Sequence, residues 1–171
     1  MDKFLIVVDM QYDFIYGSLE NEEAKKIVPN VKEKIEKYYK DGYKIIFTRD
    51  THTDNYLETS EGKKLPVKHC VEGTEGWQIV DNLDKICDCK IINKKNFGYN
   101  SWQSVLDNPT EIVLIGVCTD ICVVTNALIL KTLFPDAKIS VDASCCAGVT
   151  VDAHNAALAT MKSCQIDVEN E

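Results

Sequence analysis

The chain has 171 residues, of which 45% are hydrophobic and 27% are charged, and its formal net charge is −8. The apolar content excludes a disordered chain, and the apolar runs are far shorter than the roughly 20 residues that cross a bilayer. An acidic balance without a basic stripe argues against nucleic acid or an anionic membrane as a partner. We therefore expect a single domain over residues 1–171 that acts on a small molecule.

The N-terminus and the cysteines indicate the compartment. Met1-Asp2-Lys3 runs directly into a short apolar segment, so we expect no signal peptide and a cytoplasmic protein. Without an export signal, the eight cysteines do not predict a disulfide framework, and they form no paired CxxC motifs of a structural zinc site. Most of them, including the close pairs Cys87/Cys89 and Cys145/Cys146, are expected to pack as small buried side chains.

Short apolar runs alternate with helical patterns along the chain. We expect strands at residues 4–8, 44–48, 90–93, 112–117 and 138–141. Helices are expected over residues 27–39, which end at an Asp-Gly pair, over the apolar run 119–133 and over the alanine-rich run 152–162. A polar segment at about residues 50–78 has no clear period, and we interpret it as a functional loop, because loops of this length in a compact domain usually have a function. This alternation predicts a three-layer α/β/α fold, Rossmann-like, with a mainly parallel central sheet.

Polar side chains follow four of the predicted strands. Asp9 ends the first strand, the run from Arg49 to His52 ends the second, Lys94 ends the third, and a run from Gly116 to Cys122 follows the fourth. Ligands of parallel sheets bind beyond the carboxyl ends of the strands, near the point where the strand order reverses. The sequence thus places a carboxylate, an Asp/His pair, an ammonium group and a thiol at one edge.

Cys122 is the first candidate nucleophile. It falls in the first turn of the helix that follows the fourth strand, where the dipole and free N–H groups favour a thiolate and can form an oxyanion hole. Cys118, in the same turn, is the alternative nucleophile. Asp9 is a candidate base for the thiol proton, and Lys94 is a candidate fixed charge that keeps Asp9 ionised. Taken singly, these residues also fit a buried cysteine, a turn-capping aspartate and an exposed lysine.

A second constellation suits a metal ion. Asp50 and His52 share one face of a strand end because strand side chains alternate, and His69 lies in the same loop region. One aspartate and two histidines can bind Zn²⁺, Fe²⁺ or Mn²⁺ with open positions. Spacing does not choose between Glu61 and Glu58 as a further ligand. The alternative is a pair of hydrogen-bonded loop histidines, whereas the third histidine, His154, is expected to be structural.

Five motifs resemble, in order, those of the isochorismatase-like cysteine hydrolases, and within that family the nicotinamidase or pyrazinamidase branch. The resemblance covers the chain from residue 4 to about residue 159. The motifs are VVDMQYDF at residues 7–14, TRDTH at 48–52, HCVEGTEG at 69–76, KKNFG at 94–98 and GVCTDICV at 116–123.

The resemblance implies roles for the residues at the strand ends. Cys122 matches the nucleophile of the Thr-Asp-x-Cys motif, Asp9 matches the base, and Lys94 rather than Lys95 has the family spacing to an aromatic residue. The Val117–Cys118 bond is implied to be cis, with the Cys118 N–H group in the oxyanion hole. The metal ligands are implied to be the set Asp50, His52 and His69, with Glu61 as the candidate fourth ligand and zinc preferred over iron or manganese.

The implied reaction is hydrolysis of a small carboxamide, nicotinamide to nicotinate and ammonia. Many relatives carry a tryptophan just before the ligand histidine, whereas this chain has Leu65-Pro66 there. Phe14, Gln11, Tyr99 and Trp102 are the candidate substrate contacts. Alternatives are a cysteine hydrolase of another small amide or of an N-carbamoyl or ureido compound, and a non-catalytic metal-binding relative. The resemblance also implies a homo-oligomer.

Overall fold

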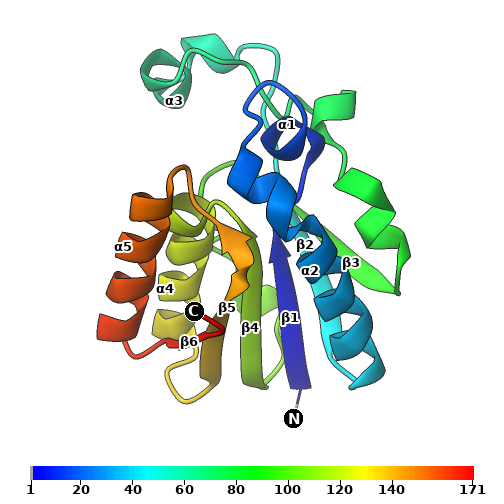
Figure 1. The fold of residues 1–171 in the computed structure, drawn as a ribbon, viewed down its shortest axis with the longest axis vertical. Coiled ribbons are helices and arrows are strands. Elements are labelled where there is room, and N and C mark those ends of the chain that lie inside the picture. Colours follow the sequence, from blue (N-terminus) through cyan, green and yellow to red (C-terminus); the bar gives the residue numbers. More distant parts are fainter. Residues whose placement is uncertain (1) are drawn as a thin grey trace.

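A six-stranded parallel sheet forms the centre of the protein in the computed structural model, which describes residues 2–171 (Figure 1). The strand order is β3-β2-β1-β4-β5-β6, and every pairing is parallel. This confirms the predicted α/β fold. The strands are β1 (Asp2–Val8), β2 (Lys44–Asp50), β3 (Cys89–Lys94), β4 (Pro109–Val117), β5 (Lys138–Ala147) and β6 (Asp167–Glu169).

The last strand, β6, was not predicted from the sequence. It has three residues, which are exposed or half-buried, so it carries no apolar run that a pattern could detect. It extends the sheet by pairing with β5 at Ser140, Val141 and Asp142.

Helices cover both faces of the sheet. The α-helices are α1 (Tyr12–Ile15), α2 (Glu22–Lys40), α3 (Ser60–Lys64), α4 (Val124–Leu133) and α5 (Val151–Ser163). Figure 1 shows α2 on one side of the strands and α4 with α5 on the other. The expected loop at 50–78 contains α3 and two short 3₁₀ turns, Tyr56–Glu58 and Glu75–Trp77. None of the described helices is long and apolar enough to cross a membrane.

Strand β1 is apolar on both faces because it lies between two helical layers. Ile6 and Val8 belong to the core under α4 and α5, whereas Leu5 and Val7 belong to the core under α2. Each of these four side chains is fully buried. The continuous apolar run that predicted this strand is therefore explained by burial on both sides.

Strand β5 is longer than the predicted run 138–141 and continues to Ala147. The polar residue Asp142 ended the apolar pattern, but its carboxylate lies 2.6 Å from Lys34 Nζ and remains buried. Because this partner on α2 offsets the cost of burying a charge, the strand continues past it. Cys145 and Cys146 consequently lie inside the strand, and both are buried, as expected from the sequence.

The strand order reverses at β1, which has β2 on one side and β4 on the other. Their carboxyl ends, together with that of β3, carry the predicted site residues. The run after β4 differs from the expected helix 119–133, because it begins with a π-helical turn, Thr119–Val123, before α4. Cys122 lies in that wider turn and not in the first turn of an α-helix.

Candidate active site

Three predicted residues meet at the carboxyl edge of the sheet. Lys94 Nζ lies 2.6 Å from Asp9 Oδ2 and 3.4 Å from Cys122 Sγ. Asp9 is fully buried, and Lys94 and Cys122 are 1% and 6% exposed. Lys94 is therefore not the exposed lysine that its sequence surroundings also allowed. It connects the buried carboxylate of Asp9 with the thiol of Cys122.

The backbone at the end of β1 turns Asp9 toward this cluster. Asp9 has a φ of +49°, a left-handed conformation that aspartate adopts more readily than most residues. Its carboxylate Oδ1 accepts a hydrogen bond of 2.6 Å from the hydroxyl of Thr48, which also contacts the Asp9 N–H group. The neighbouring strand β2 thus orients the Asp9 carboxylate and leaves its other oxygen to Lys94.

Burial dominates the electrostatics of this cluster. It raises the pKa of Asp9 above its usual value, although the Lys94 charge and the Thr48 hydroxyl act in the opposite direction. Burial and the nearby Asp9 carboxylate also raise the pKa of Cys122 well above that of a free thiol. The pKa of Lys94 is raised, because the charge and the hydrogen bond of Asp9, with the charge of Asp50, outweigh the effect of burial. Lys94 is therefore a permanent cation, whereas Cys122 rests as a thiol beside a strengthened base.

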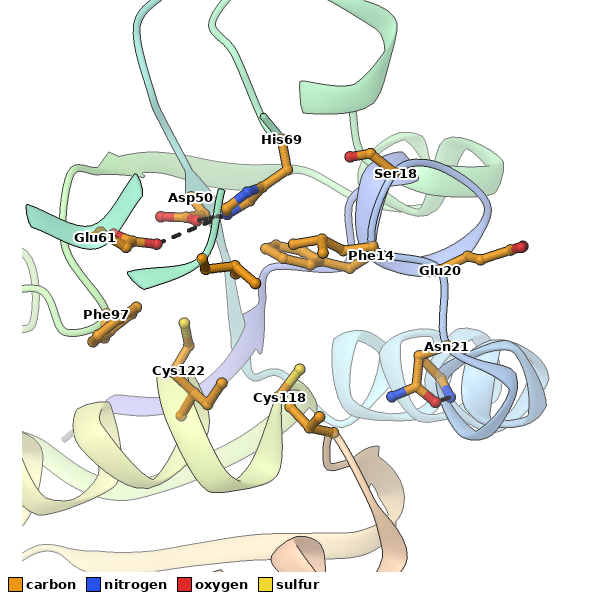
Figure 2. Close-up of a pocket in the computed structure, with 15 residues that line it drawn as sticks. Phe14, Ser18, Glu20, Asn21, Asp50, Glu61, His69, Phe97, Cys118 and Cys122 are labelled. Carbon is orange, nitrogen blue, oxygen red and sulfur yellow. Dashed lines mark hydrogen bonds and ion pairs between the residues drawn. The ribbon is translucent and has the colours of Figure 1, made fainter. Parts of the chain in front are cut away.

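The turn that carries Cys122 is held from two sides. The Val117–Cys118 peptide bond is cis, as the resemblance implied. The carbonyl of Cys118 accepts hydrogen bonds of 3.1 Å from the N–H groups of Ile121 and Val123. Figure 2 shows that Cys118 and Cys122 both face the cavity described below. Only Cys122 has its sulfur within hydrogen-bonding reach of Lys94, so the geometry favours it over Cys118 as the nucleophile.

Two contacts tie this turn to the rest of the fold. Gly116 has a φ of +117°, and a Cβ there would come within 2.1 Å of the Val8 carbonyl oxygen, so only glycine fits where β4 passes β1. On the other side, the Thr119 hydroxyl lies 2.7 Å from Nδ1 of His154 on α5. The structural role expected of His154 is consistent with this contact.

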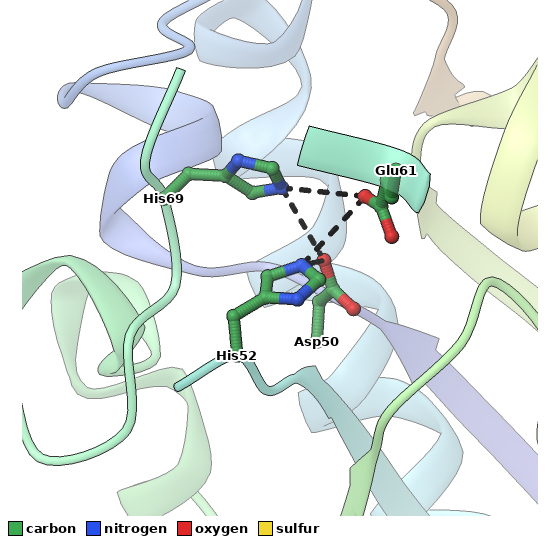
Figure 3. Close-up of side chains that lie close together, drawn as sticks. All are labelled: Asp50, His52, Glu61 and His69. Carbon is green, nitrogen blue, oxygen red and sulfur yellow. Dashed lines mark hydrogen bonds and ion pairs between the residues drawn. The ribbon is translucent and has the colours of Figure 1, made fainter. Parts of the chain in front are cut away.

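Four further side chains converge next to the cluster (Figure 3). Asp50 Oδ2 lies 2.9 Å from His52 Nε2 and 3.6 Å from His69 Nε2. Glu61 Oε1 lies 3.7 and 3.9 Å from the same two nitrogens. One donor atom from each residue falls within 4.8 Å of all the others. Glu61 comes from α3, whereas Glu58, the alternative from the sequence, lies outside this group.

The donor set fits a divalent metal ion. Two imidazole nitrogens and two carboxylate oxygens are the ligands that zinc and other first-row metals accept. Nδ1 of His69 lies 2.8 Å from the Val67 carbonyl oxygen, a contact that fixes the ring and leaves Nε2 for a metal. Burial would raise the pKa of Asp50, but hydrogen bonds from the two histidines and the Lys94 charge outweigh it and lower that pKa. Asp50 is therefore an ionised carboxylate that could bind a metal ion.

Gln11 positions Asp50 instead of lining the cavity. It is fully buried, and its side-chain amide pairs with the Asp50 backbone, accepting from the N–H group at 2.7 Å and donating to the carbonyl at 2.9 Å. The same amide donates to the carbonyl of Trp77 at 3.0 Å. Gln11 thus acts on the site through the backbone of β2 rather than at the substrate contact that we expected.

Tyr99 and Trp102, the other expected substrate contacts, also lie away from the cavity lining. The Trp102 side chain is fully buried in the core beneath α4, and Tyr99 packs edge-on against it. Both residues bond to Oδ1 of Asn126, through the Tyr99 N–H at 2.9 Å and the Trp102 indole N–H at 3.0 Å. The Trp102 indole N–H group points into the protein, and neither side chain lines the cavity.

Asn126 is a residue of the site that the sequence reasoning missed. It is fully buried, and its Nδ2 donates to the carbonyl oxygens of Cys122 at 2.8 Å and Phe97 at 3.1 Å. It thereby joins the segment after Lys94 to the helix that follows Cys122. A single amide in the apolar run after Cys122 was the available signal, because a buried amide needs partners.

A cavity of about 620 Å³ opens directly above the two groups. Phe14 lines it from α1, with its ring centroid 5.6 Å from that of His69, and Phe97 and Leu65 lie at its exposed rim. Figure 2 shows Cys122 below the cavity and Asp50, Glu61 and His69 on the far wall. A small molecule in this space can reach the Cys122 thiol and three of the four clustered donors, Asp50, Glu61 and His69, at the same time.

Comparisons with known proteins show which family the chain belongs to. The sequence model of the isochorismatase domain family matches residues 3–170. A nicotinamidase of Schizosaccharomyces pombe is 26% identical over 98% of this chain and 92% of its own length. A nicotinamidase of Saccharomyces cerevisiae is 27% identical over 74% of this chain and 80% of its own length.

Solved structures share the fold over almost the whole chain. A pyrazinamidase of Pyrococcus horikoshii, solved in complex with zinc, is 29% identical with a TM-score of 0.84 and covers 98% of both chains. A nicotinamidase of Bacillus subtilis is 24% identical with a TM-score of 0.86 and covers 99% of this chain and 100% of its own. At that identity, the second likeness concerns the fold alone.

Proposed function

Because the chain belongs to the isochorismatase domain family, we propose that it is a cysteine amidohydrolase that converts nicotinamide to nicotinate and ammonia. The observation that carries the proposal is the buried contact of Lys94 with both Asp9 and Cys122. The curated relatives over most of the chain are nicotinamidases, which supports the choice of substrate.

The first half-reaction forms a thioester. The Asp9 carboxylate takes the proton of the Cys122 thiol, and the sulfur attacks the amide carbon as its carbonyl double bond opens to an oxyanion. Lys94 stays protonated and stabilises the negative charge as it moves from Asp9 to sulfur. The N–H groups of Cys118 and Cys122 hold the oxyanion. The carbon–nitrogen bond then breaks, and ammonia leaves with the proton that Asp9 returns.

The second half-reaction releases the acid. Asp9, ionised again, takes a proton from a water molecule that attacks the thioester carbon. The carbon–sulfur bond breaks, and the Cys122 sulfur recovers the proton from Asp9. Burial favours this cycle because it raises the pKa of Asp9, which makes the carboxylate a stronger base than in water.

We further propose that Asp50, His52, Glu61 and His69 hold one divalent metal ion, with zinc as the first candidate. The donor set supports this, and the zinc-complexed pyrazinamidase relative agrees with the choice of metal. The bound metal would supply a Lewis-acid contact that orients the ring nitrogen of the substrate. Phe14 packs beside His69 and provides an aromatic wall for the ring.

The test is ammonia release from nicotinamide by the purified protein, with Cys122→Ala as the paired variant. We expect turnover in the native chain and none in the variant, which should stay folded because the change in core volume is small. Cys118→Ala is the matched control, because it also removes a thiol from the cavity, and we expect it to keep activity. Turnover by Cys122→Ala would overturn the assigned nucleophile, and no turnover by the native chain would overturn the substrate.

A second candidate substrate class is another small amide or an N-carbamoyl compound. Leu65 favours it, because this branched side chain lies at the rim where many relatives, by the resemblance, have an aromatic ring. Ammonia release from a panel of small amides and ureido compounds separates the two candidates. A higher kcat/KM for a ureido compound than for nicotinamide would favour the second.

A further inference from the structure

The cavity extends well beyond the two groups that the proposed reaction uses. Its far part lies under the chain between α1 and α2 and is lined by Ser18, Leu19, Asn21, Ala24 and Val149. We call this part the side lobe. Figure 2 shows Ser18 above Phe14 and Asn21 on the opposite side of Phe14 from Glu61, with Cys118 between Cys122 and Asn21. The side lobe therefore continues the cavity sideways from the catalytic cluster.

A nicotinamide molecule would leave the side lobe empty. Its reacting carbon must lie at Cys122, and its ring nitrogen would face the cluster that contains His69. The line between these two points crosses the cavity on the Glu61 side of Phe14 (Figure 2). The 2-position lies on one side of this line and the 4-, 5- and 6-positions lie on the other, so a 5-substituent enters the gap between Phe14 and Cys118 when the second edge faces it. A single ring fills only part of a cavity of about 620 Å³.

The side lobe has a neutral and mostly apolar lining. Asn21 is already engaged, because its Nδ2 donates to the Gly148 carbonyl at 2.8 Å and its Oδ1 caps α2. The nearby carboxylate of Glu20 pairs with Lys25 Nζ at 2.8 Å. Leu19, Ala24 and Val149 supply apolar surface to the side lobe, and Ser18 adds a small polar hydroxyl group. This chemistry suits an uncharged alkyl chain better than an ionic substituent.

We propose that the side lobe is a second substrate subsite and that the protein hydrolyses nicotinamides with an uncharged alkyl group at the 5-position. This inference rests on the proposed function and specifies its substrate class. Each methylene removed from water favours binding by about 0.8 kcal/mol, which is roughly fourfold. A propyl group that enters the side lobe should therefore lower KM by about tenfold or more relative to nicotinamide.

The experiment compares kcat/KM for nicotinamide and 5-propylnicotinamide in the full chain. It includes Leu19→Trp, which fills the side lobe, and Leu57→Trp as the matched control, because Leu57 is exposed and lies outside the cavity. Leu19→Trp should lower kcat/KM for the propyl compound by about tenfold or more and leave nicotinamide within about twofold. Leu57→Trp should change neither. Val149→Phe fills the lobe from the other side and replaces Leu19→Trp if that variant does not fold.

Binding gives a readout that is independent of turnover. Titration calorimetry with Cys122→Ala should show tighter binding of 5-propylnicotinamide than of nicotinamide, and Leu19→Trp in that background should abolish the difference.

The outcomes separate this inference from the proposed function. If nicotinamide is hydrolysed and the propyl compound is neither hydrolysed nor bound more tightly, the side lobe is not a subsite. The same conclusion holds if Leu19→Trp reduces both activities equally. If only the propyl compound is hydrolysed, the subsite stands and nicotinamide is the wrong substrate. If neither compound is bound or hydrolysed, both proposals fall.

Discussion

The ammonium group of Lys94 lies 2.6 Å from Asp9 Oδ2, and neither side chain has any exposed surface. A pair of opposite charges in this setting has lost its hydration and is stabilised by mutual attraction and by hydrogen bonds. Lys94 also donates to the Asn96 carbonyl at 3.2 Å and lies 3.4 Å from Cys122 Sγ. The same contacts that hold Lys94 in the core direct its charge at the thiol.

Loss of Lys94 should cost both stability and reactivity. In Lys94→Met the Asp9 carboxylate stays buried without its cation, and we expect the free energy of unfolding to fall by about 3–5 kcal/mol. Urea unfolding measures this loss. Lys94→Met combined with Asp9→Asn removes both charges, so it should recover part of the stability but none of the activity. Equal stability of the single and double variants would show that the two charges are not coupled.

The acid limb of the activity profile should depend on Thr48. Because Asp9 must be ionised to accept the thiol proton, kcat/KM should fall as the pH drops through the raised pKa of Asp9. The Thr48 hydroxyl lowers that pKa by its hydrogen bond of 2.6 Å. Thr48→Val removes this bond with little change of shape and should move the limb to higher pH. Thr132→Val, on the exposed side of α4, is the control, and an unmoved limb in Thr48→Val would argue against Asp9 as the base.

Metal content should depend on Glu61 and not on Glu58. Glu61→Gln removes the charge of one carboxylate in the four-residue group, so the purified protein should hold less metal and lose it at lower chelator concentrations. Glu58→Gln is the matched control, because it makes the same change outside the group. Elemental analysis after graded chelation measures both. Chelation should also raise KM more than it lowers kcat, since the metal is proposed to orient the substrate.

Asn126 should be critical for the register of the site. Asn126→Leu leaves the Trp102 indole N–H and the carbonyl oxygens of Phe97 and Cys122 without a side-chain partner. Each unsatisfied buried group costs about 1–3 kcal/mol, so we expect about 3 kcal/mol of destabilisation together with a lower kcat. Unfolding curves and steady-state kinetics test this. Asn30→Leu, which removes an exposed side-chain bond to the Ser144 carbonyl, should change stability by less than about 0.5 kcal/mol.

The buried ion pair between Asp142 and Lys34 should make stability depend on pH. Burial would raise the pKa of Asp142, but Lys34, Ser144 and Asn170 outweigh it, and the pKa in the folded state is lowered. A lowered pKa means that the contribution of Asp142 is fully present above its unfolded value of about 3.9 and is lost as the pH falls through the folded value. Asp142→Asn should therefore destabilise the protein by about 3 kcal/mol at pH 7, with a smaller difference below pH 4. A difference that stays constant between pH 7 and pH 3 would contradict this assignment.

Residues close together in the sequence determined much of the fold. The buried strands are continuous apolar runs in the sequence because helices cover both of their faces. The alternation of strands and helices along the chain predicts a parallel sheet. The same reasoning placed Asp9, Asp50 and Lys94 at one edge, since parallel strands end on the same side. Strand β5 was underestimated because a polar residue, Asp142, interrupts its pattern, and its partner Lys34 lies 108 residues away in the chain.

Tertiary packing alone decided which side chains face the cavity. Spacing could not distinguish Glu61 from Glu58, because the direction of each carboxylate depends on how α3 and the preceding 3₁₀ turn lie over β2. Tyr99 and Trp102 are aromatic residues that could form a wall for a ring, but Trp102 is buried in the core, where its indole N–H bonds to Asn126, and the half-buried Tyr99 packs against it. The side lobe likewise exists because the segment before α2 lies beside Val149, which is distant in sequence. Local sequence thus determines the elements and their ends, whereas long-range contacts determine where each side chain points.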